Sequence, residues 1–398
     1  MKSVLLPYFN KVRGNIIPGA HRIQKLVSPW LSAGILNFPC ILVTGSNGKG
    51  STCAYLERIL REHGIKTGLY TSPHLVHPNE RIRINGVPVL EEVLAENIIE
   101  IEKQISLYLP DASFFEITTA TALLIFLKEK INFLVCEVGL GGHFDSTNAL
   151  SPLLSVLTSI SLEHTEYLGN SIQKIAADKA YVSRRNRPFI VASLSDEAFA
   201  GVKDSCEKIG SRIVLSEKGD NVNLQTALCA IQQLSTVTDL KFDKDVIQSA
   251  VKKTFWPGRF DVREIRNRTV IFDASHNPDG FNFFAQKYLT SSFAGKKCVL
   301  IFASLSDKDW ESTLKKIHLI AEHVIFTQIE SSRSVPVEKF LNSVAQMQSF
   351  PDYEIISNID EALEKALNTK PQLTLVLTGS IAFIGTAMEH FGLEVFVN

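Results

Sequence analysis

The first informative stretch of the chain is Val43-Thr44-Gly45-Ser46-Asn47-Gly48-Lys49-Gly50-Ser51-Thr52. It follows the apolar, β-branched run at residues 41–43, which is typical of a buried strand. After it, apolar side chains recur at helical spacing, among them Cys53, Leu56, Ile59 and Leu60. A strand, a glycine-rich loop and a helix in this order predict a loop whose backbone N–H groups converge on an anion.

The residues of this loop favour a phosphate group as the anion. Gly45, Gly48 and Gly50 let the main chain take positive φ and approach a ligand closely. Lys49 supplies a positive charge for terminal phosphates, and the Ser51 hydroxyl suits Mg²⁺. Gly50 separates the lysine from the hydroxyl residue, so the strict P-loop pattern is not met. A glycine-rich structural turn with a surface lysine is the alternative, but the coincidence of all these features favours phosphate binding.

The remaining chain repeats the alternation of short apolar runs and amphipathic stretches. We expect strands at 66–70, 133–136 and 153–157, helices at 91–107, 115–130 and 171–180, and an end of the first helix at Gly64. After Trp256-Pro257-Gly258 the pattern restarts, with strands expected at 269–274, 297–302, 323–327 and 373–378. The sequence thus predicts an α/β protein. We expect residues 1–257 to form a P-loop-type, mostly parallel sheet domain, and residues 258–398 to form a smaller, Rossmann-like α/β domain.

The composition limits the class of protein and the cellular compartment that we expect. The chain has 398 residues, 45% hydrophobic and 21% charged, with a formal net charge of -1. This balance gives no sign of a nucleic-acid or membrane partner. Its six cysteines lack Cys-x-x-Cys spacing and sit mostly in apolar runs, so we interpret them as buried free thiols. The expected location is the reducing cytoplasm.

Further polar residues follow the expected strands. Glu137 comes directly after the buried run 133–136, at an edge that faces the ligand crevice in open α/β sheets. The loop 139–148 contains three glycines, which suits either close ligand approach or a plain structural turn. His164 follows another apolar run, although a lone histidine is more often a hydrogen-bonding residue than a ligand. Lys179, taken alone, is interpreted as exposed.

Together these segments resemble the bifunctional dihydrofolate synthase/folylpolyglutamate synthase family within the Mur ligase superfamily. The resemblance covers nearly the whole chain and is specific because many short motifs occur in one order. These motifs are Gly45–Ser51, Tyr70–Leu75, Asn79–Ile82, Glu137–Gly142, Asp178–Ala180, Pro257–Arg259, His276–Pro278 and Asp307–Asp309.

The resemblance implies an ATP-dependent ligase that adds L-glutamate to dihydropteroate and to reduced folates through an acyl phosphate. A carboxylate is a poor electrophile, and phosphorylation gives it a leaving group. Catalysis then depends on positioning and charge neutralisation. The implied cofactors are ATP and two Mg²⁺ ions, and the working form is expected to be a monomer.

Residue roles carried over from the family fall into four groups. Catalytic roles go to Lys49, Lys179, His164 and Arg259. ATP contacts go to Gly45, Asn47, Gly48, Lys49, Gly50, Ser51, Thr226, Arg259 and Asp273. The metal ligands are Ser51, Ser72, Glu137, His164 and Lys179, the last as a carbamate. Substrate contacts go to Ser72, Pro73, His74, Phe115, Glu116, Thr118, Asp145, Ser146 and His276, with Asp307–Asp309 facing the glutamate end.

The sequence departs from the family pattern at several positions, which bear mainly on the first-substrate pocket. These are Ile17-Pro18-Gly19 for Asp-Leu-Gly, His143 for arginine, Glu163 for aspartate, Asp178 for glutamate, Thr226 for asparagine and Ala274-Ser275 for Gly-Ala. The alternatives are a synthase with one of the two activities, a Mur-type ligase for another acid, a simple P-loop kinase, or a nucleotide-binding module without turnover. The pterin-side motifs favour dihydrofolate synthase activity.

Overall fold

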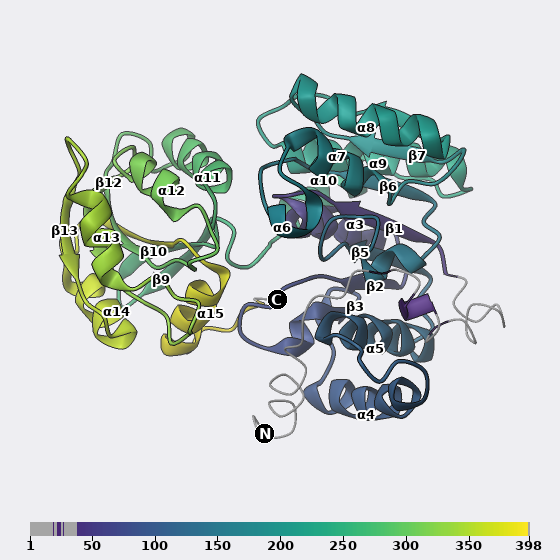
Figure 1. Ribbon diagram of the computed structural model, residues 1–398, viewed down its shortest axis with the longest axis horizontal. Coiled ribbons are helices and arrows are strands. Elements are labelled where there is room, and N and C mark those ends of the chain that lie inside the picture. Colours follow the sequence, from purple (N-terminus) through teal and green to yellow (C-terminus); the bar gives the residue numbers. More distant parts are fainter. Residues whose placement is uncertain (1–18, 20–21, 25–26, 28–37, 397–398) are drawn as a thin grey trace. The chain divides into compact units, whose positions relative to one another are not determined.

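The computed structural model describes residues 19, 22–24, 27 and 38–396. The chain divides into two compact units, Met1–Phe255 and Trp256–Asn398. Each unit is built on its own sheet with helices on both faces (Figure 1). The expected Ile17-Pro18 departure lies outside the described residues.

In the described part of unit 1, eight strands form a sheet in the order β4-β3-β2-β5-β1-β6-β7-β8. The pairs from β2 through β8 are parallel, whereas β2–β3 and β3–β4 are antiparallel. The strands are β1 Cys40–Thr44, β2 Thr67–Tyr70, β3 Ile82–Ile84, β4 Val87–Pro88, β5 Phe133–Glu137, β6 Leu154–Leu157, β7 Pro188–Val191 and β8 Arg212–Leu215. Because β1, β2, β5 and β6 are parallel, their carboxyl ends share one edge.

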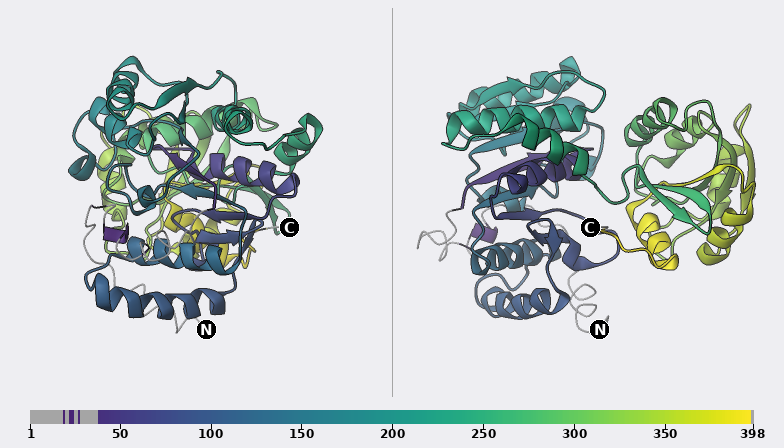
Figure 2. Two further views of the ribbon diagram at one scale, coloured as in Figure 1. Left: turned by 90° about the vertical axis from the view of Figure 1, so that its right-hand side faces the viewer. Right: turned by 180° about the vertical axis from the view of Figure 1, so that it is seen from behind.

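Helices cover both faces of this sheet because its central strands are apolar on both sides. Cys40, Leu42, Leu134 and Cys136 pack into a core shared with α5, α7 and α8. Alternate residues of a strand face opposite sides, so Ile41 and Val43 face the side of α3, which also contacts α9 and α10. Helix α4 packs on the outer side of α5 (Figures 1 and 2). The helices are α3 Lys49–Glu62, α4 Glu91–Tyr108, α5 Phe114–Lys128, α6 Thr165–Leu168, α7 Ile172–Ala180, α8 Asp196–Ile209, α9 Val222–Val237 and α10 Lys244–Lys253, with 3-10 turns η1 Pro78–Arg81 and η2 Ser146–Ala149.

Unit 2 has a six-stranded sheet in the order β13-β12-β11-β14-β10-β9 among its described residues. Only the edge pair β9–β10 is antiparallel. Helices α11, α12 and α13 share a core with one face, and α14 and α15 contact the strands from the other side (Figure 1). The elements are β9 Asp261–Ile265, β10 Arg268–Asp273, β11 Cys298–Phe302, β12 Ala321–Phe326, β13 Asp352–Ile355, β14 Thr374–Thr378, α11 Pro278–Thr290, α12 Trp310–Ile317, α13 Val337–Val344, α14 Ile359–Asn368 and α15 Ile381–His390.

The expected fold class, with a mostly parallel first sheet and a second α/β sheet, is confirmed. The predicted strands and helices all exist within a few residues of their expected limits, and Gly64 follows the end of α3 with a φ of 78°. The expected alternation did not include β3, β4, β7, β8, β9 or β13. None of the helices in the described part of the chain combines the length and apolar composition that crossing a bilayer requires.

Candidate active site

The glycine loop connects β1 to α3 as the sequence predicts. Gly45 and Gly48 have φ angles of 143° and 85°, in the region that side chains rarely adopt. A Cβ at Gly45 would lie 2.1 Å from Thr158 Oγ1, so no other residue fits there. The loop is held from the end of β6, where the Ser159 carbonyl accepts from Ser46 N at 2.9 Å and the Ser159 hydroxyl accepts from Asn47 N at 2.8 Å. The loop is therefore shaped by its neighbours as well as by its own glycines.

Helix α9 contributes a residue to this loop that the sequence analysis did not single out. A Cβ at Gly48 would lie 2.1 Å from Asn223 Oδ1, so this amide side chain lies directly against the loop. The predicted nucleotide contact Thr226 lies about one turn later on α9. Its side chain is fully buried, and its hydroxyl donates to the Val222 carbonyl at 2.7 Å. Asn223 is thus better placed than Thr226 to reach a nucleotide, and the asparagine at the start of α9 is the signal that could have found it.

Two lysine ammonium groups converge on one carbonyl of the loop. Lys49 Nζ donates to Gly45 O at 2.9 Å and to Ser46 O at 3.2 Å. Lys179 Nζ, from α7, donates to the same Gly45 carbonyl at 3.1 Å. The interpretation of Lys179 as an exposed lysine was wrong, because its side chain is 2% exposed. Burying a charge is costly unless it is paired, and Lys179 pairs with Glu163 at 3.1 Å.

Glu163 provides the negative charge between these lysines. Burial alone would raise the pKa of its carboxyl, but the charges of Lys179 and Lys49 lower that pKa to about 2. Burial lowers the pKa of Lys179, while Glu163 acts in the opposite direction. Its neighbour His164, predicted as a metal ligand, is exposed at the start of α6. The loop, Lys49, Lys179 and Glu163 therefore form one charged cluster at the carboxyl edge of the sheet.

Glu137 ends β5 at the same edge. It pairs in register with Val43, two residues before Gly45, and is 5% exposed. Its Oε2 accepts from the backbone N–H of Ser72 at 3.2 Å, so the loop after β2 meets the end of β5. Among the described residues no three His, Cys, Asp or Glu side chains gather as a metal cluster. The predicted donors at this edge are instead a carboxylate and serine hydroxyls, which are hard oxygen ligands that fit Mg²⁺.

The predicted acid-binding residues surround the ends of β2 and β5. Tyr70 is buried, and its hydroxyl lies 3.1 Å from the hydroxyls of both Thr118 and Thr119. A Cβ at Gly139 would lie 2.4 Å from Phe115 Cζ, so this ring packs on the backbone of the loop that follows β5. Pro73 is exposed, whereas His74 is half-buried. Phe115, Thr118 and the segment Ser72–His74 are thus brought to one region of unit 1.

Two predicted substrate residues have carboxylates that already bind the protein itself. Glu116 completes a capping box with Ser113 at the start of α5 and pairs with Arg22 at 2.8 Å. Asp145 accepts from Leu140 N at 2.8 Å and from Thr147 N at 2.9 Å, which fixes the loop 139–148 after β5. Their contacts are those of residues that hold the surrounding structure in place.

The other residues near this loop are held by local contacts. Ser146 is buried in η2, the turn that Asp145 caps. The ring of His143, which replaces the family's arginine, contacts the rings of Phe144 and Tyr181 edge-on, each at 4.3 Å between centroids. Asp178 accepts from Gly142 N at 2.9 Å and so connects α7 to the same loop. His143 thus presents a packed aromatic ring at a position where the resemblance leads us to expect an arginine.

Asp273 and His276 lie in the first βα connection of unit 2, and Asp307–Asp309 lie in the next one, between β11 and α12. Asp273 ends β10 and is buried, and it accepts from Phe260 N at 2.8 Å. Burial raises the pKa of the Asp273 carboxyl, and Arg259 acts in the opposite direction, so the two charges are neighbours. His276 lies just beyond, with Nδ1 3.2 Å from Ala274 O. Asp309 caps α12 through Ser312 N at 3.1 Å, and Asp307 pairs with Arg333 at 2.8 Å.

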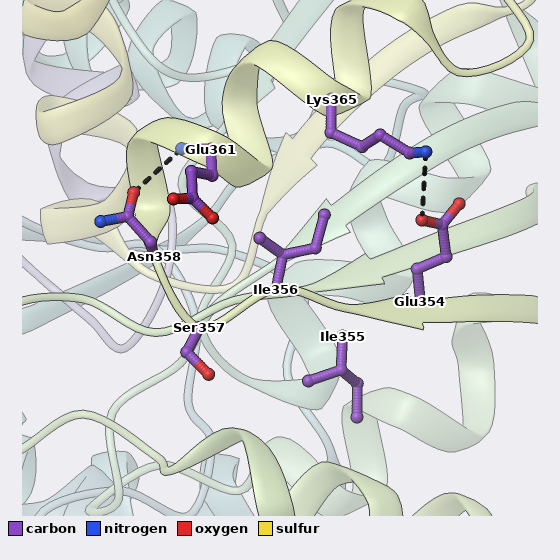
Figure 3. A pocket seen from close by; sticks show the side chains of 7 residues that line it. All are labelled: Glu354, Ile355, Ile356, Ser357, Asn358, Glu361 and Lys365. Carbon is purple, nitrogen blue, oxygen red and sulfur yellow. Dashed lines mark hydrogen bonds and ion pairs between the residues drawn. The ribbon is translucent and has the colours of Figure 1, made fainter.

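One hollow of about 640 Å³ lies elsewhere on unit 2, beside β13 and the start of α14 (Figure 3). An ion pair between Lys365 and Glu354, 3.6 Å apart, crosses its rim. None of the predicted site residues lines it: its walls are Glu354, Ile355, Ile356, Ser357, Asn358, Glu361 and Lys365.

Comparison with known families agrees with this geometry. Residues 43–262, more than half of the chain, match the model of the Mur ligase middle domain. Residues 258–381 match the model of the Mur ligase glutamate ligase domain. The chain belongs to the Mur ligase family.

Within the Mur ligase family, individual relatives show which members this chain is similar to. The Bacillus subtilis protein named dihydrofolate synthase/folylpolyglutamate synthase is 27% identical over 415 residues, which cover 94% of this chain and 95% of the relative. Two solved structures share the fold. Escherichia coli FolC in complex with DHPP and ADP gives a TM-score of 0.86 at 27% identity, covering 96% of each chain. The Yersinia pestis bifunctional folylpolyglutamate synthase/dihydrofolate synthase complexed with AMPPNP and Mn ion gives 0.86 at 25% identity, covering 98% of each.

Proposed function

We propose that this Mur ligase joins L-glutamate to dihydropteroate, and to reduced folates, with hydrolysis of ATP to ADP and phosphate. The observation that carries the proposal is the meeting of three features at one sheet edge. These are a phosphate loop with two lysines, a buried carboxylate at Glu137, and a group of packed side chains, Tyr70, Phe115 and Thr118. The relatives named above, two of them with both activities in their names, support the choice of substrates.

The chemistry proceeds in two transfers. An oxygen of the acid's carboxylate attacks the γ-phosphorus of ATP, the bond to the β–γ bridging oxygen breaks, and ADP leaves. The neutral α-amine of glutamate then attacks the activated carbonyl and loses its proton, and inorganic phosphate departs with the C–O electron pair. Both transfers build negative charge on oxygen, so fixed cations and backbone N–H groups stabilise the transition states.

In this proposal the glycine loop holds the triphosphate. Its N–H groups and the start of α3 offer donors and a positive potential, and Lys49 turns from Gly45 O to the terminal phosphates. Asn223 contacts the nucleotide from α9, in place of the predicted Thr226. Arg259 and Asp273 stay predicted nucleotide contacts, and His276 and Asp307–Asp309 stay predicted contacts on the glutamate side.

The metal ligands stay those expected from the resemblance: Ser51, Ser72 and Glu137 for one Mg²⁺, and His164 with carbamylated Lys179 for the second. Bound Mg²⁺ neutralises phosphate charge at the reacting end of ATP. Ser51 lies in α3, Ser72 follows β2 and Glu137 ends β5, so the three oxygen ligands would come from the sheet edge that carries the phosphate loop. A carbamate on Lys179 would replace its cation with an anion beside Glu163, so the carbamate requires a cation to offset the two charges.

The acid's ring system occupies the region lined by Phe115, Thr118 and the Ser72–His74 segment. Glu116 and Asp145 act indirectly: Glu116 fixes the start of α5, and Asp145 fixes the loop 139–148. In this proposal residues 1–257 form the domain that binds the nucleotide and the pterin, and residues 258–398 form the C-terminal ligase domain. The six free cysteines support a reducing cytoplasmic setting.

Isotope transfer tests this chemistry directly. Dihydropteroate labelled with ¹⁸O in its carboxylate should transfer one ¹⁸O to the released phosphate, because that oxygen bridges carbon and phosphorus in the acyl phosphate. Unlabelled phosphate formed together with the glutamate adduct would contradict an acyl phosphate. ATP binding without any phosphate release, with either acid, would favour the nucleotide-binding module without turnover.

A further inference from the structure

The turn η1 presents a buried arginine to which no function has been assigned. Arg81 is the last residue of η1, immediately before β3, and its backbone carbonyl accepts from Thr71 N at 3.0 Å. Its side chain is 8% exposed. The segment Asn79–Ile82 is one of the family motifs found in the sequence, yet neither the phosphate loop nor the metal ligands involve it.

The guanidinium of Arg81 is only partly satisfied. Among the described residues its one hydrogen bond runs from Nε to His74 Nδ1 at 2.9 Å. Its Cζ also lies 5.2 Å from the ring centroid of Phe114. The two Nη groups, which carry four N–H donors, have no acceptor in the part of the chain that the structure describes. These donors belong to a largely buried side chain and remain available to a ligand, so the arrangement suits an anion.

The acidic side chain next to Arg81 in the sequence does not neutralise it. Glu80 directs its carboxylate to the backbone N–H groups of Leu75, Val76 and His77, at 2.8, 2.9 and 2.6 Å. Burial lowers the pKa of the Arg81 guanidinium, while Tyr70, Glu137 and Glu80 act in the opposite direction. An arginine nevertheless stays protonated in proteins. The site therefore holds a permanent positive charge.

The position of Arg81 identifies the anion. His74, Phe114 and Tyr70 place it on the pterin side of unit 1, where the half-buried Phe115 and the buried Thr118 also lie. Glu137, at the carboxyl end of β5, marks the nucleotide side. A planar guanidinium with two free Nη groups matches the two oxygens of a carboxylate.

We propose that Arg81 binds the reacting carboxylate of the acid substrate. This assignment rests on the proposed function and names the residue that orients the group to be phosphorylated. Two Nη–H···O bonds hold the carboxylate between the pterin pocket and the γ-phosphate, while Nε stays on His74. When the carboxylate becomes an acyl phosphate, Arg81 stabilises the negative charge that collects on the carbonyl oxygen during attack by the amine.

Binding measurements without ATP test this assignment apart from turnover. The probes are dihydropteroate and its neutral primary amide, each titrated by calorimetry into wild type and Arg81→Met, which keeps an apolar stem against Phe114. The wild type should prefer the acid to the amide by about 10- to 100-fold, the effect of hydrogen bonds to a charged group. Arg81→Met should bind acid and amide about equally and bind ADP as the wild type does.

Two further variants sharpen the comparison. Arg83→Met removes a buried arginine of β3 whose Nε donates to Glu80 O at 3.0 Å, and it should keep the wild-type preference. Arg81→Lys keeps the charge and should retain part of the preference for the acid over the amide. It replaces Arg81→Met in the comparison if that variant does not fold. Wild-type discrimination in the Arg81 variants, or weaker binding of ADP with unchanged acid binding, would overturn the assignment. If the wild type turns over dihydropteroate, the proposed function stands whatever the Arg81 variants show. If the wild type binds no pterin acid, both the proposed function and the role of Arg81 are wrong.

Discussion

Lys179 Nζ lies 3.1 Å from a carboxylate oxygen of Glu163, beside the phosphate loop; the lysine side chain is 2% exposed and the glutamate side chain 12%. The same ammonium donates to the Gly45 carbonyl at 3.1 Å. Two of the three N–H donors of the unmodified lysine are therefore engaged, one of them by a glutamate where the resemblance leads us to expect an aspartate. This pairing connects α7 and the segment after β6 to the loop that holds the nucleotide.

Lys179→Ala should lower turnover by about 100-fold or more, because an oriented charge next to the reacting phosphates is lost. Phosphate release from ATP in the presence of acid and L-glutamate measures the effect. Partial recovery on adding a short carboxylate such as acetate would support the carbamate, because acetate can replace its oxygens. Lys174→Ala, which changes an exposed lysine of the same helix, is the control and should leave the rate unchanged. Wild-type activity in Lys179→Ala would contradict any role for this residue in catalysis.

Gly48→Ala should weaken nucleotide binding far more than its backbone strain alone explains. The new Cβ would meet Asn223 Oδ1 at 2.1 Å and would push the side chain away from the loop. Gly64→Ala is a matched control, since Gly64 has a φ of 78° but nothing within 4 Å of the added Cβ. Both changes carry the cost of a left-handed residue, about 1 kcal/mol. We expect only Gly48→Ala to reduce ADP affinity in calorimetry, and equal ADP affinities in the two variants would refute the clash.

Glu116→Gln should destabilise unit 1 by about 3 kcal/mol, because it breaks a largely buried ion pair with Arg22 and weakens the capping box of α5. Asp111→Asn provides the comparison. Asp111 pairs with the same arginine at 3.1 Å but is 59% exposed, so its loss should cost less than about 1 kcal/mol. Urea denaturation of both variants measures the difference. Similar free energies of unfolding would show that burial of the Arg22–Glu116 pair is unimportant.

Cys40 should make the protein less stable as the pH rises above 9. Burial in β1 raises the pKa of this thiol from 9.0 to about 12. In the unfolded chain the thiol ionises near its usual pKa, so between these values the unfolded state binds fewer protons and stability falls with pH. The contribution is about 1.4 kcal/mol per pH unit. Comparing wild type with Cys40→Ala by urea denaturation at pH 8 and pH 11 isolates it. A gap that stays constant with pH would contradict the buried neutral thiol.

The sequence was sufficient for features that depend on local pattern. The phosphate loop is written in consecutive residues, and the central strands β1, β5 and β11 are continuous apolar runs. The edge strands were harder to predict. β8 and β13 expose much of their length and carry polar residues, so their apolar signal is weak. They form because a neighbouring strand offers a free edge, which is a property of the assembled sheet.

Within the site, the sequence could not predict which charged residues meet. The burial of Lys179 had a signal, because the residue falls on the apolar stripe of α7 with Ile175, Ala176 and Ala180. Its partner Glu163 belongs to another segment, and no spacing rule connects them. The same holds for Asn223, which α9 brings to Gly48. Glu116 lies in the expected region, but its contacts with Ser113 and Arg22 give it a structural role.

The most direct test of the proposed function is ATP-dependent phosphate release by the purified chain with Mg²⁺ and L-glutamate. Dihydropteroate and tetrahydrofolate serve in turn as the acid, with product identity confirmed by mass spectrometry. The account predicts release with both acids, one glutamate added for each phosphate, and no release when glutamate or the acid is withheld. Release with neither acid, from a chain that binds ATP, would contradict the claim that this Mur ligase acts on folate-type acids.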